Sequence, residues 1–331
     1  MSYTSKYTGE QIDALLDAVG QGGGVTPSRP TWTGHADAEG LRAIGWTDED
    51  IAYYQENGVN WNEEDDEYHK VSDDNKALYG VLTADNIQNY KDRIVYLPKI
   101  DTSAKTNMNS MFYNCSSLVS IPQLNTAKVT NMGSMFNGCR SLVSIPQLDT
   151  QSVTYMGYMF NGCISLVSIP QLDTQNVTDV GGMFSGCYSL VSIPQLDTQK
   201  VTNMNYMFSE CYSLVGIPQL NTQKVTNMNY MFNYCSSLVG IQLDTQSVTN
   251  VSYMFYDCSS LTTANLKNVK RPYQLNNSAL LSKESLLYII NNEAATYAIT
   301  IKLASYAYTR LSTDADVVAA LEAHPNISIS A

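Results

Sequence analysis

One pattern of hydrophobic and polar positions recurs seven times along the middle of the chain. Each copy, typified by residues 201–224 (VTNMNYMFSECYSLVGIPQLNTQK), begins with apolar residues three or four positions apart and ends in a short β-branched run. The first spacing is typical of a helix and predicts Thr202 as its N-cap, because a threonine hydroxyl can accept an early backbone N–H. The second half, residues 214–220, is bounded by Asn-Thr and predicts a strand that leads into a turn.

Seven cysteines mark the repeat, and each stands three positions after a phenylalanine. The intervals between successive cysteines are 24 residues five times and then 23. Five copies carry a proline in their second half, whereas the sixth and seventh lack it. Because proline cannot donate to a sheet, we expect it in a bulge or at the start of a strand. A partial copy over residues 94–100 precedes the array, which gives eight strand halves and seven helical halves.

No copy can bury its apolar face alone, so the copies are expected to stack ~4.8 Å apart as a right-handed solenoid. This α/β repeat would carry a parallel sheet on one face and short helices on the other. Parallel Cβ directions and an odd count argue against disulfides, and no histidine accompanies the cysteines as a zinc ligand, so core thiols are expected. The predicted core ladder comprises Phe112, Phe136, Phe160, Phe184, Phe208, Phe232, Phe255, Cys115, Cys139, Cys163, Cys187, Cys211, Cys235 and Cys258.

The copies without proline show the L-x-x-L-x-L rhythm of a leucine-rich repeat, as in residues 238–243. Together with the first half they resemble the BspA-like leucine-rich repeats of bacterial surface proteins, in the short VTNMxxMFxxCxSL variant. The resemblance covers residues 94–270. It implies a leucine-rich-repeat solenoid used for adhesion and binding, and it brings no catalytic motif.

The first 24 residues predict an attachment or oligomerisation helix followed by a flexible glycine linker (residues 1–24). Thr8 and Gln11 form a capping box, and a stripe of apolar residues three or four positions apart must dock on a second copy, on a larger assembly or on its own chain. The stripe is Ile12, Leu15, Leu16 and Val19. The segment YTGEQIDALLDAV resembles the start of phage or prophage tail and fibre proteins of gut bacteria. That context implies virion proteins as partners and assembly in the host cytoplasm, in keeping with the lack of a visible secretory signal.

Two further regions flank the repeats. Residues 1–93 contain 7 basic and 18 acidic residues, and residues 25–93 predict a small acidic helical domain whose last helix is capped by Thr83. Its core is expected to hold the three tryptophans, and parts of it resemble the region before the repeats in the same phage proteins. Residues 271–331 alternate between helix and strand patterns, and predict a C-terminal α/β cap whose strands continue the solenoid sheet. Its expected elements are a helix from Ser282, a strand over 297–303, a helix over 314–323 and a strand over 326–330.

Residues with catalytic or metal-binding potential do not form a known site. The acidic run of residues 63–67 lacks the alternating pattern of a calcium loop, and His35, His69 and His324 lie far apart. The net charge of −12 argues against nucleic acid or an anionic membrane as partner. We therefore expect no enzyme, no cofactor, no metal and no membrane insertion. A row of turn residues is expected to form Asx turns, with a string of bound cations as the alternative: Asn125, Asp149, Asp173, Asp197, Asn221 and Asp244.

The positions that vary between copies predict a binding surface. Five residues before, one before and one after each cysteine, the chain uses mainly Tyr, Ser, Gly and Asn, as antibody paratopes do. Aromatic rows also suit sugar rings. The alternative is drift at exposed positions, with tyrosine kept for packing along a ladder. The candidate surface consists of Tyr158, Tyr188, Tyr206, Tyr212, Tyr230, Tyr234 and Tyr253.

Taken together, the sequence predicts a non-enzymatic binding protein. The favoured hypothesis is a phage or prophage tail-associated protein whose tyrosine-rich repeats recognise a glycan or protein on the host surface. Its N-terminal helix is expected to attach it to virion proteins or to a second copy of itself as a homo-oligomer. One alternative is a BspA-like adhesin on a bacterial cell surface. Another is a purely structural virion component whose repeats pack against neighbouring proteins.

Overall fold

The structure is a computed structural model that describes residues 83–92, 94, 97, 100–275, 277–296 and 298–331. The chain divides into two compact units, Met1–Tyr68 and His69–Ala331, and all described residues belong to the second. The predicted attachment helix and linker of residues 1–24 lie outside the described residues, as do residues 25–82 of the predicted acidic domain.

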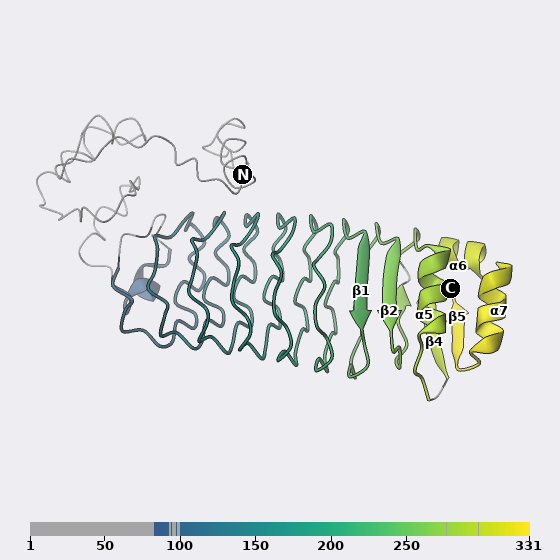
Figure 1. Cartoon of the computed structure of the whole chain (residues 1–331). Coiled ribbons are helices and arrows are strands. Elements are labelled where there is room, and N and C mark those ends of the chain that lie inside the picture. The colour runs from purple at the N-terminus through teal and green to yellow at the C-terminus, as the bar shows by residue number, and fades with distance from the viewer. Residues whose placement is uncertain (1–82, 93, 95–96, 98–99, 276, 297) are drawn as a thin grey trace, which may run out of the picture. The chain divides into compact units, whose positions relative to one another are not determined.

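The repeats form a solenoid in which each copy is one coil stacked on the next (Figure 1). Parallel bridges connect equivalent residues of successive coils, from Asn107–Asn131 to Asn227–Asn250. A regular backbone bond accompanies them, for example from the Thr202 N–H to the carbonyl of Thr178 at 2.9 Å. The predicted repeat solenoid is therefore confirmed by the hydrogen bonds of the chain itself.

The prediction of a helix in the first half of each copy is wrong. In the coil of residues 201–224, this segment is a series of turns: the N–H groups of Met207, Ser209 and Cys211 each donate to the carbonyl three residues earlier. Tyr206 and Glu210 have φ of 55° and 61°, and this left-handed conformation interrupts an α-helix. Alternate N–H groups donate instead to carbonyls of the next coil: those of Met204, Tyr206, Phe208 and Glu210.

Thr202 is not an N-cap. Its hydroxyl donates to the carbonyl of Thr178 in the preceding coil at 3.3 Å, and so strengthens the contact between coils. The capping role falls to the next residue, since the side-chain oxygen of Asn203 accepts the N–H of Asn205 at 3.2 Å. Asparagine and aspartate favour such local turns, which explains why they predominate at this position.

The second half of each copy forms a strand only where the proline is missing. Among the described coils, the two strands are β1 (Gly240–Asp244) and β2 (Thr263–Lys267), which pair in parallel with Ile241 opposite Ala264 (Figure 1). The same segment of the proline-containing coils is not a strand. Proline removes one ladder donor and adds one residue, so a regular strand pairing cannot form.

A glutamine directly after each proline compensates for the lost strand hydrogen bonds. The side-chain amide of Gln147 donates to the backbone carbonyl of Gln171 at 2.6 Å, and Gln171 donates to Gln195 in the same way at 2.6 Å. These side-chain bonds add to the few backbone bonds that remain between these segments, such as that from the Val167 N–H to the Val143 carbonyl at 3.2 Å.

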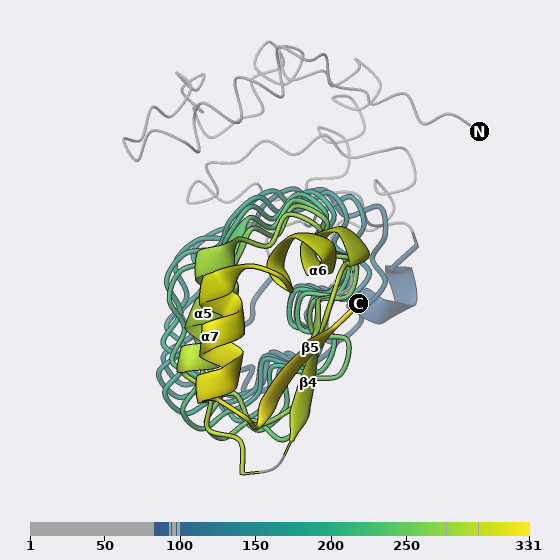
Figure 2. The same ribbon diagram turned by 90° about the vertical axis from the view of Figure 1, so that its right-hand side faces the viewer.

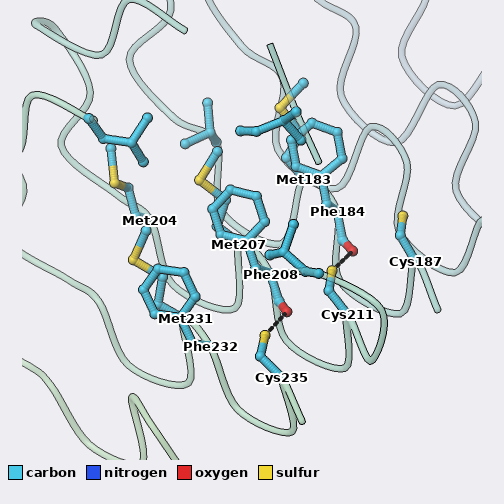
Figure 3. Close-up of a cluster of buried hydrophobic side chains, with 14 of the residues drawn as sticks. Met183, Phe184, Cys187, Met204, Met207, Phe208, Cys211, Met231, Phe232 and Cys235 are labelled. Carbon is cyan, nitrogen blue, oxygen red and sulfur yellow. Dashed lines mark hydrogen bonds between the residues drawn. The ribbon is translucent and has the colours of Figure 1, made fainter. Parts of the chain in front are cut away.

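The core is a set of ladders that run along the solenoid (Figure 3). Every phenylalanine and cysteine of the predicted ladder is fully buried, at 0% exposure. Neighbouring phenylalanine rings stack with centroids 5.3–5.7 Å apart. Each thiol from the second coil on donates to the phenylalanine carbonyl of the preceding coil, as Cys211 does to Phe184 at 3.1 Å.

The C-terminal elements follow β2 along the same axis (Figure 1). Helices α5 (Lys283–Asn291) and α7 (Ala315–Ala323) begin after Ser282 and Asp314 as predicted, with both side chains accepting helix N–H groups. Strands β4 (Ile299–Leu303) and β5 (Ile327–Ser330) also lie where they were expected. The sequence did not predict α6, which spans Ser305–Leu311.

These strands do not continue the solenoid sheet. With β3 (Gln274–Leu275) they form a separate parallel sheet of order β3-β4-β5. The helix α5 packs against β2, and viewed along the axis α5 and α7 lie side by side (Figure 2). At the other end, the helix expected after Thr83 is a short 3-10 helix, η1 (Ile87–Tyr90), whose Gln88 side chain donates to the Met111 carbonyl at 3.0 Å.

Candidate binding surface

The tyrosines of the candidate surface stand at fixed places beside the fully buried cysteine ladder. Two of the three variable positions have a positive φ in all seven coils. The position five residues before cysteine holds Ser110, Ser134, Tyr158, Gly182, Tyr206, Tyr230 and Tyr253, and the position directly before cysteine holds Asn114, Gly138, Gly162, Gly186, Glu210, Tyr234 and Asp257.

This geometry corrects the comparison with antibody paratopes. Glycine and asparagine occur at these two positions because the backbone there is left-handed, a conformation that these residues tolerate best. A tyrosine or glutamate there costs roughly 1–2 kcal/mol relative to glycine. Such a side chain is present despite a conformational cost, and its own contacts are expected to offset that cost.

The tyrosines five residues before cysteine form a stacked row. The rings of Tyr206 and Tyr230 lie 4.7 Å apart at 7°, and those of Tyr230 and Tyr253 lie 5.0 Å apart at 19°. Tyr158 continues the row by lying over Gly182, where a Cβ would come within 2.4 Å of its ring. Stacked rings cover each other's faces, so this row presents ring edges and hydroxyls, which agrees with the ladder-packing alternative.

The rings in a second group of tyrosines contact one another but are not stacked in parallel. The rings of Tyr188 and Tyr212 are 4.9 Å apart but tilted by 47°, and Tyr234 meets Tyr256 edge to face at 5.5 Å and 77°. Tyr256 also contacts Tyr253 edge to face at 5.9 Å and so connects the two groups. The sequence reasoning missed Tyr256, which stands two residues before its cysteine, a position that was not compared between copies. We call Tyr188, Tyr212, Tyr234 and Tyr256 the open tyrosine cluster.

Glu210 lies within the open tyrosine cluster. The hydroxyl of Tyr188 donates to its Oε2 at 3.4 Å. Burial and then the charge of Glu210 raise the pKa of both Tyr188 and Tyr212. Neighbouring Tyr256 and then partial burial raise the pKa of Tyr234. The phenols therefore stay protonated at neutral pH, and Tyr188, Tyr212 and Tyr234 remain 37–40% exposed.

An open groove of about 1410 Å³ runs along another side of the same coils. Rows of glutamines line it, on either side of the turn residues for which Asx turns were predicted. Those turns are confirmed, for example by the Gln199 N–H, which donates to Asp197 at 3.0 Å. No group of three or more His, Cys, Asp or Glu in the described part of the chain is placed to hold a metal ion. The groove residues thus have structural hydrogen bonds of their own.

Within the described part of the chain, neither the cysteines nor His324 belong to a cluster that could hold a metal ion. All seven cysteines are free, and burial raises the pKa of each thiol, to about 12 for Cys115 and Cys258. His324 lies 3.7 Å from a carboxylate oxygen of Glu293 in the C-terminal elements. His35 and His69 lie outside the described residues.

Comparison with known families identifies the repeats. The family described as "Mycoplasma protein of unknown function, DUF285" matches residues 84–192 and again residues 189–283. The chain belongs to this family. The two matches cover more than half of the chain. Together they include η1, all seven coils and the segment up to the start of α5.

Solved leucine-rich-repeat structures show a weaker likeness. A leucine-rich repeat protein of T. pallidum is 19% identical, covers 63% of this chain and 86% of its own, and has a TM-score of 0.40. A leucine-rich cell surface protein of Faecalibacterium prausnitzii is 17% identical, with coverages of 76% and 83% and a TM-score of 0.31. Because both TM-scores are low, the solenoid fold is supported by the hydrogen bonds between coils and not by these structures. No curated protein matches the chain. None of the helices in the described residues has the length and apolar character needed to cross a membrane.

Proposed function

We propose that this DUF285 chain is a non-enzymatic binding protein and that the open tyrosine cluster contacts its ligand. The observation that carries the proposal is the contrast between the two tyrosine groups. The rings of the stacked row pack face to face within the chain, whereas those of Tyr188 and Tyr212 are tilted by 47° and cover each other's faces only in part. Exposed aromatic rings on a rigid support contribute large contact area at small entropic cost.

The backbone beneath the cluster is held on both sides, which favours a preformed site. The N–H of Glu210 donates to the Asn233 carbonyl at 2.7 Å, and the N–H of Tyr234 donates to the Tyr256 carbonyl at 2.7 Å. Ser213 donates to the carbonyl of Tyr188 at 3.3 Å. A ligand therefore meets rings whose backbone is already ordered, and less conformational entropy is lost on binding.

We further propose that the chain acts at the host surface as part of a phage or prophage tail. The resemblance of residues 7–19 to tail proteins supports this placement, with residues 1–24 attaching the chain to virion proteins or to a second copy. The BspA-like adhesin is the alternative, since the repeats also resemble that group. A purely structural virion role is the third possibility, and it requires the open tyrosines to be buried in the particle.

The test compares the full-length chain with a double variant, Tyr188→Ala with Tyr212→Ala, for retention on bacterial envelope fractions. Gln199→Ala is the matched control, because it removes an exposed groove side chain while its backbone keeps the bond to Asp197. We expect the double variant to lose at least about tenfold in affinity and the control to lose none. Equal retention of all three proteins would refute the proposal. Protection of these tyrosines from nitration in intact particles would instead support the structural role.

A further inference from the structure

The position of Glu210 is unusual within the repeat. Directly before cysteine, three of the earlier coils carry glycine: Gly138, Gly162 and Gly186, all with positive φ. Glu210 adopts the same left-handed conformation at φ 61°. A residue with a carboxylate side chain thus occupies a position whose left-handed backbone is least costly for glycine. Backbone strain of this kind is concentrated at functional sites.

Nothing in the described part of the chain neutralises this carboxylate. No Lys, Arg or His among those residues forms an ion pair with Glu210. Its one hydrogen bond is the long contact from the Tyr188 hydroxyl at 3.4 Å. Asp257, at the same position two coils later, differs because its Oδ1 accepts the Asn277 amide at 2.8 Å. Glu210 therefore keeps an uncompensated negative charge among aromatic rings.

This combination complements a cation. Tyrosine faces attract an ammonium group through their quadrupole, and a carboxylate beside them adds direct charge attraction. The charge of Arg140 acts on Tyr188, lowering its pKa, but Arg140 forms no ion pair with Glu210 in the described structure. In the preceding coil, the residue equivalent to Glu210 is Gly186, which has no side chain that could cover the carboxylate.

The other groups of the cluster favour a saccharide as the carrier of the cation. Three of the four phenols are near the Glu210 charge: the Tyr188 hydroxyl donates to it at 3.4 Å, and the charge helps to raise the pKa of Tyr212 and Tyr234. Each phenol hydroxyl can both donate and accept a hydrogen bond. A lysine side chain would use the carboxylate and the rings but would reach few of these hydroxyls. A sugar offers hydroxyls in several directions and a C–H face that can lie on an open ring.

We propose that Glu210, with Tyr188, Tyr212, Tyr234 and Tyr256, binds the ammonium group of an amino sugar in a surface glycan. This inference rests on the proposed function and specifies its ligand class. The glycan would contact the open ring faces, and its charged amine would lie at the Glu210 carboxylate.

The test uses the full-length chain and two oligosaccharides that differ only in N-acetylation, which removes the positive charge of each amine: a β-1,4-linked glucosamine hexamer and its N-acetylated counterpart. Calorimetry should show the cationic hexamer binding about tenfold more tightly, with an advantage that declines as salt rises. Glu210→Gln should abolish the advantage, and so should Glu210→Gly, which restores the residue of earlier coils and relieves the left-handed strain. Asp173→Asn is the matched control, because Asn125 and Asn221 hold the same Asx turn in other coils.

Equal binding of the two hexamers, or an advantage that survives Glu210→Gln, would overturn the inference. Binding of a lysine hexapeptide in a Glu210-dependent manner, without binding of either hexamer, would also overturn it and assign the cation to a protein. These outcomes differ from failure of the proposed function. If only the inference fails, the Tyr188 and Tyr212 double variant still loses envelope binding while Glu210→Gln does not.

Discussion

Two aromatic ladders run along this solenoid, one of phenylalanine inside it and one of tyrosine on its surface. The phenylalanine rings stack 5.3–5.7 Å apart at 2–8°, and Tyr206, Tyr230 and Tyr253 stack 4.7–5.0 Å apart at 7–19°. Both spacings follow from the stacking of equivalent positions in successive coils. The phenylalanines are fully buried, whereas Tyr253 is 41% exposed.

The difference shows that the same ring geometry serves two purposes. Inside, the ladder removes apolar surface from water and is present in every coil. Outside, it is interrupted by serine and glycine in the early coils and becomes continuous only from Tyr206 onwards. Stacking is therefore a consequence of the repeat, and burial decides how much free energy it contributes.

The largest expected effect concerns the thiols that accompany the buried ladder. Burial raises the pKa of every cysteine, so the folded chain retains thiol protons that the unfolded chain loses above about pH 8.5–9. Stability is then fully present below that range and falls with rising pH, by about 1.4 kcal/mol per pH unit for each thiol. Urea unfolding with reductant at pH 8 and pH 10 measures the loss. In Cys187→Ala, the free energy of unfolding should fall less steeply with pH, by the contribution of one thiol. An equal stability at pH 8 and pH 10 would contradict the burial of the cysteines.

The next largest effect is expected within the phenylalanine ladder itself. Phe184→Ala removes a ring that stacks on Phe160 and Phe208 in the middle of the array. The lost burial and the remaining cavity should lower the free energy of unfolding by about 3–5 kcal/mol. Denaturant unfolding measures the change, with the surface variant Tyr206→Ala as the matched control. A Phe184→Ala variant that melts like the parent chain would refute its place in the core.

Much of this interior was predictable from sequence, and the local backbone was not. The 24-residue period and the invariant phenylalanine and cysteine positions indicate stacked coils whatever the conformation between them. Apolar residues three or four apart suit a helix and also suit consecutive turns, so Met204, Met207 and Phe208 could not distinguish the two. The signal that was available is the recurrence of glycine and asparagine directly before cysteine, as at Gly138 and Asn114, which indicates a left-handed residue in every coil.

The candidate surface was predictable to a smaller extent. Comparison between copies found the tyrosine rows but could not tell which ring faces stay open, because tilt depends on contacts between coils. Tyr188 and Tyr212 occupy a different repeat position from Tyr206 and Tyr230, but nothing in the sequence of that position indicates that their rings are tilted. Glu210 was part of the variable set and became prominent only when its φ and its neighbours were known.

A smaller effect is expected where the surface row passes over a glycine. Gly182→Ala introduces a Cβ at φ 60° and within 2.4 Å of the Tyr158 ring. The left-handed conformation should cost about 1–2 kcal/mol, and the ring can move aside at little further cost. Thermal or urea unfolding of Gly182→Ala, alone and combined with Tyr158→Ala, separates strain from the clash. A penalty that disappears in the double variant would contradict strain as its main cause.

The smallest effect distinguishes the two ladders most directly. Tyr230→Ala removes a ring from the stacked surface row but keeps a Cβ at φ 55°, so the conformational cost remains and only the ring contacts are lost. We expect a loss of about 1 kcal/mol, the low end of the range for two aromatic pairs, because the row lies at the surface. Tyr230→Gly loses the same contacts but regains about 1–2 kcal/mol of left-handed strain, so it should unfold close to the parent chain in urea. If Tyr230→Ala costs as much as Phe184→Ala, the surface row is part of the core and the distinction between the ladders is wrong.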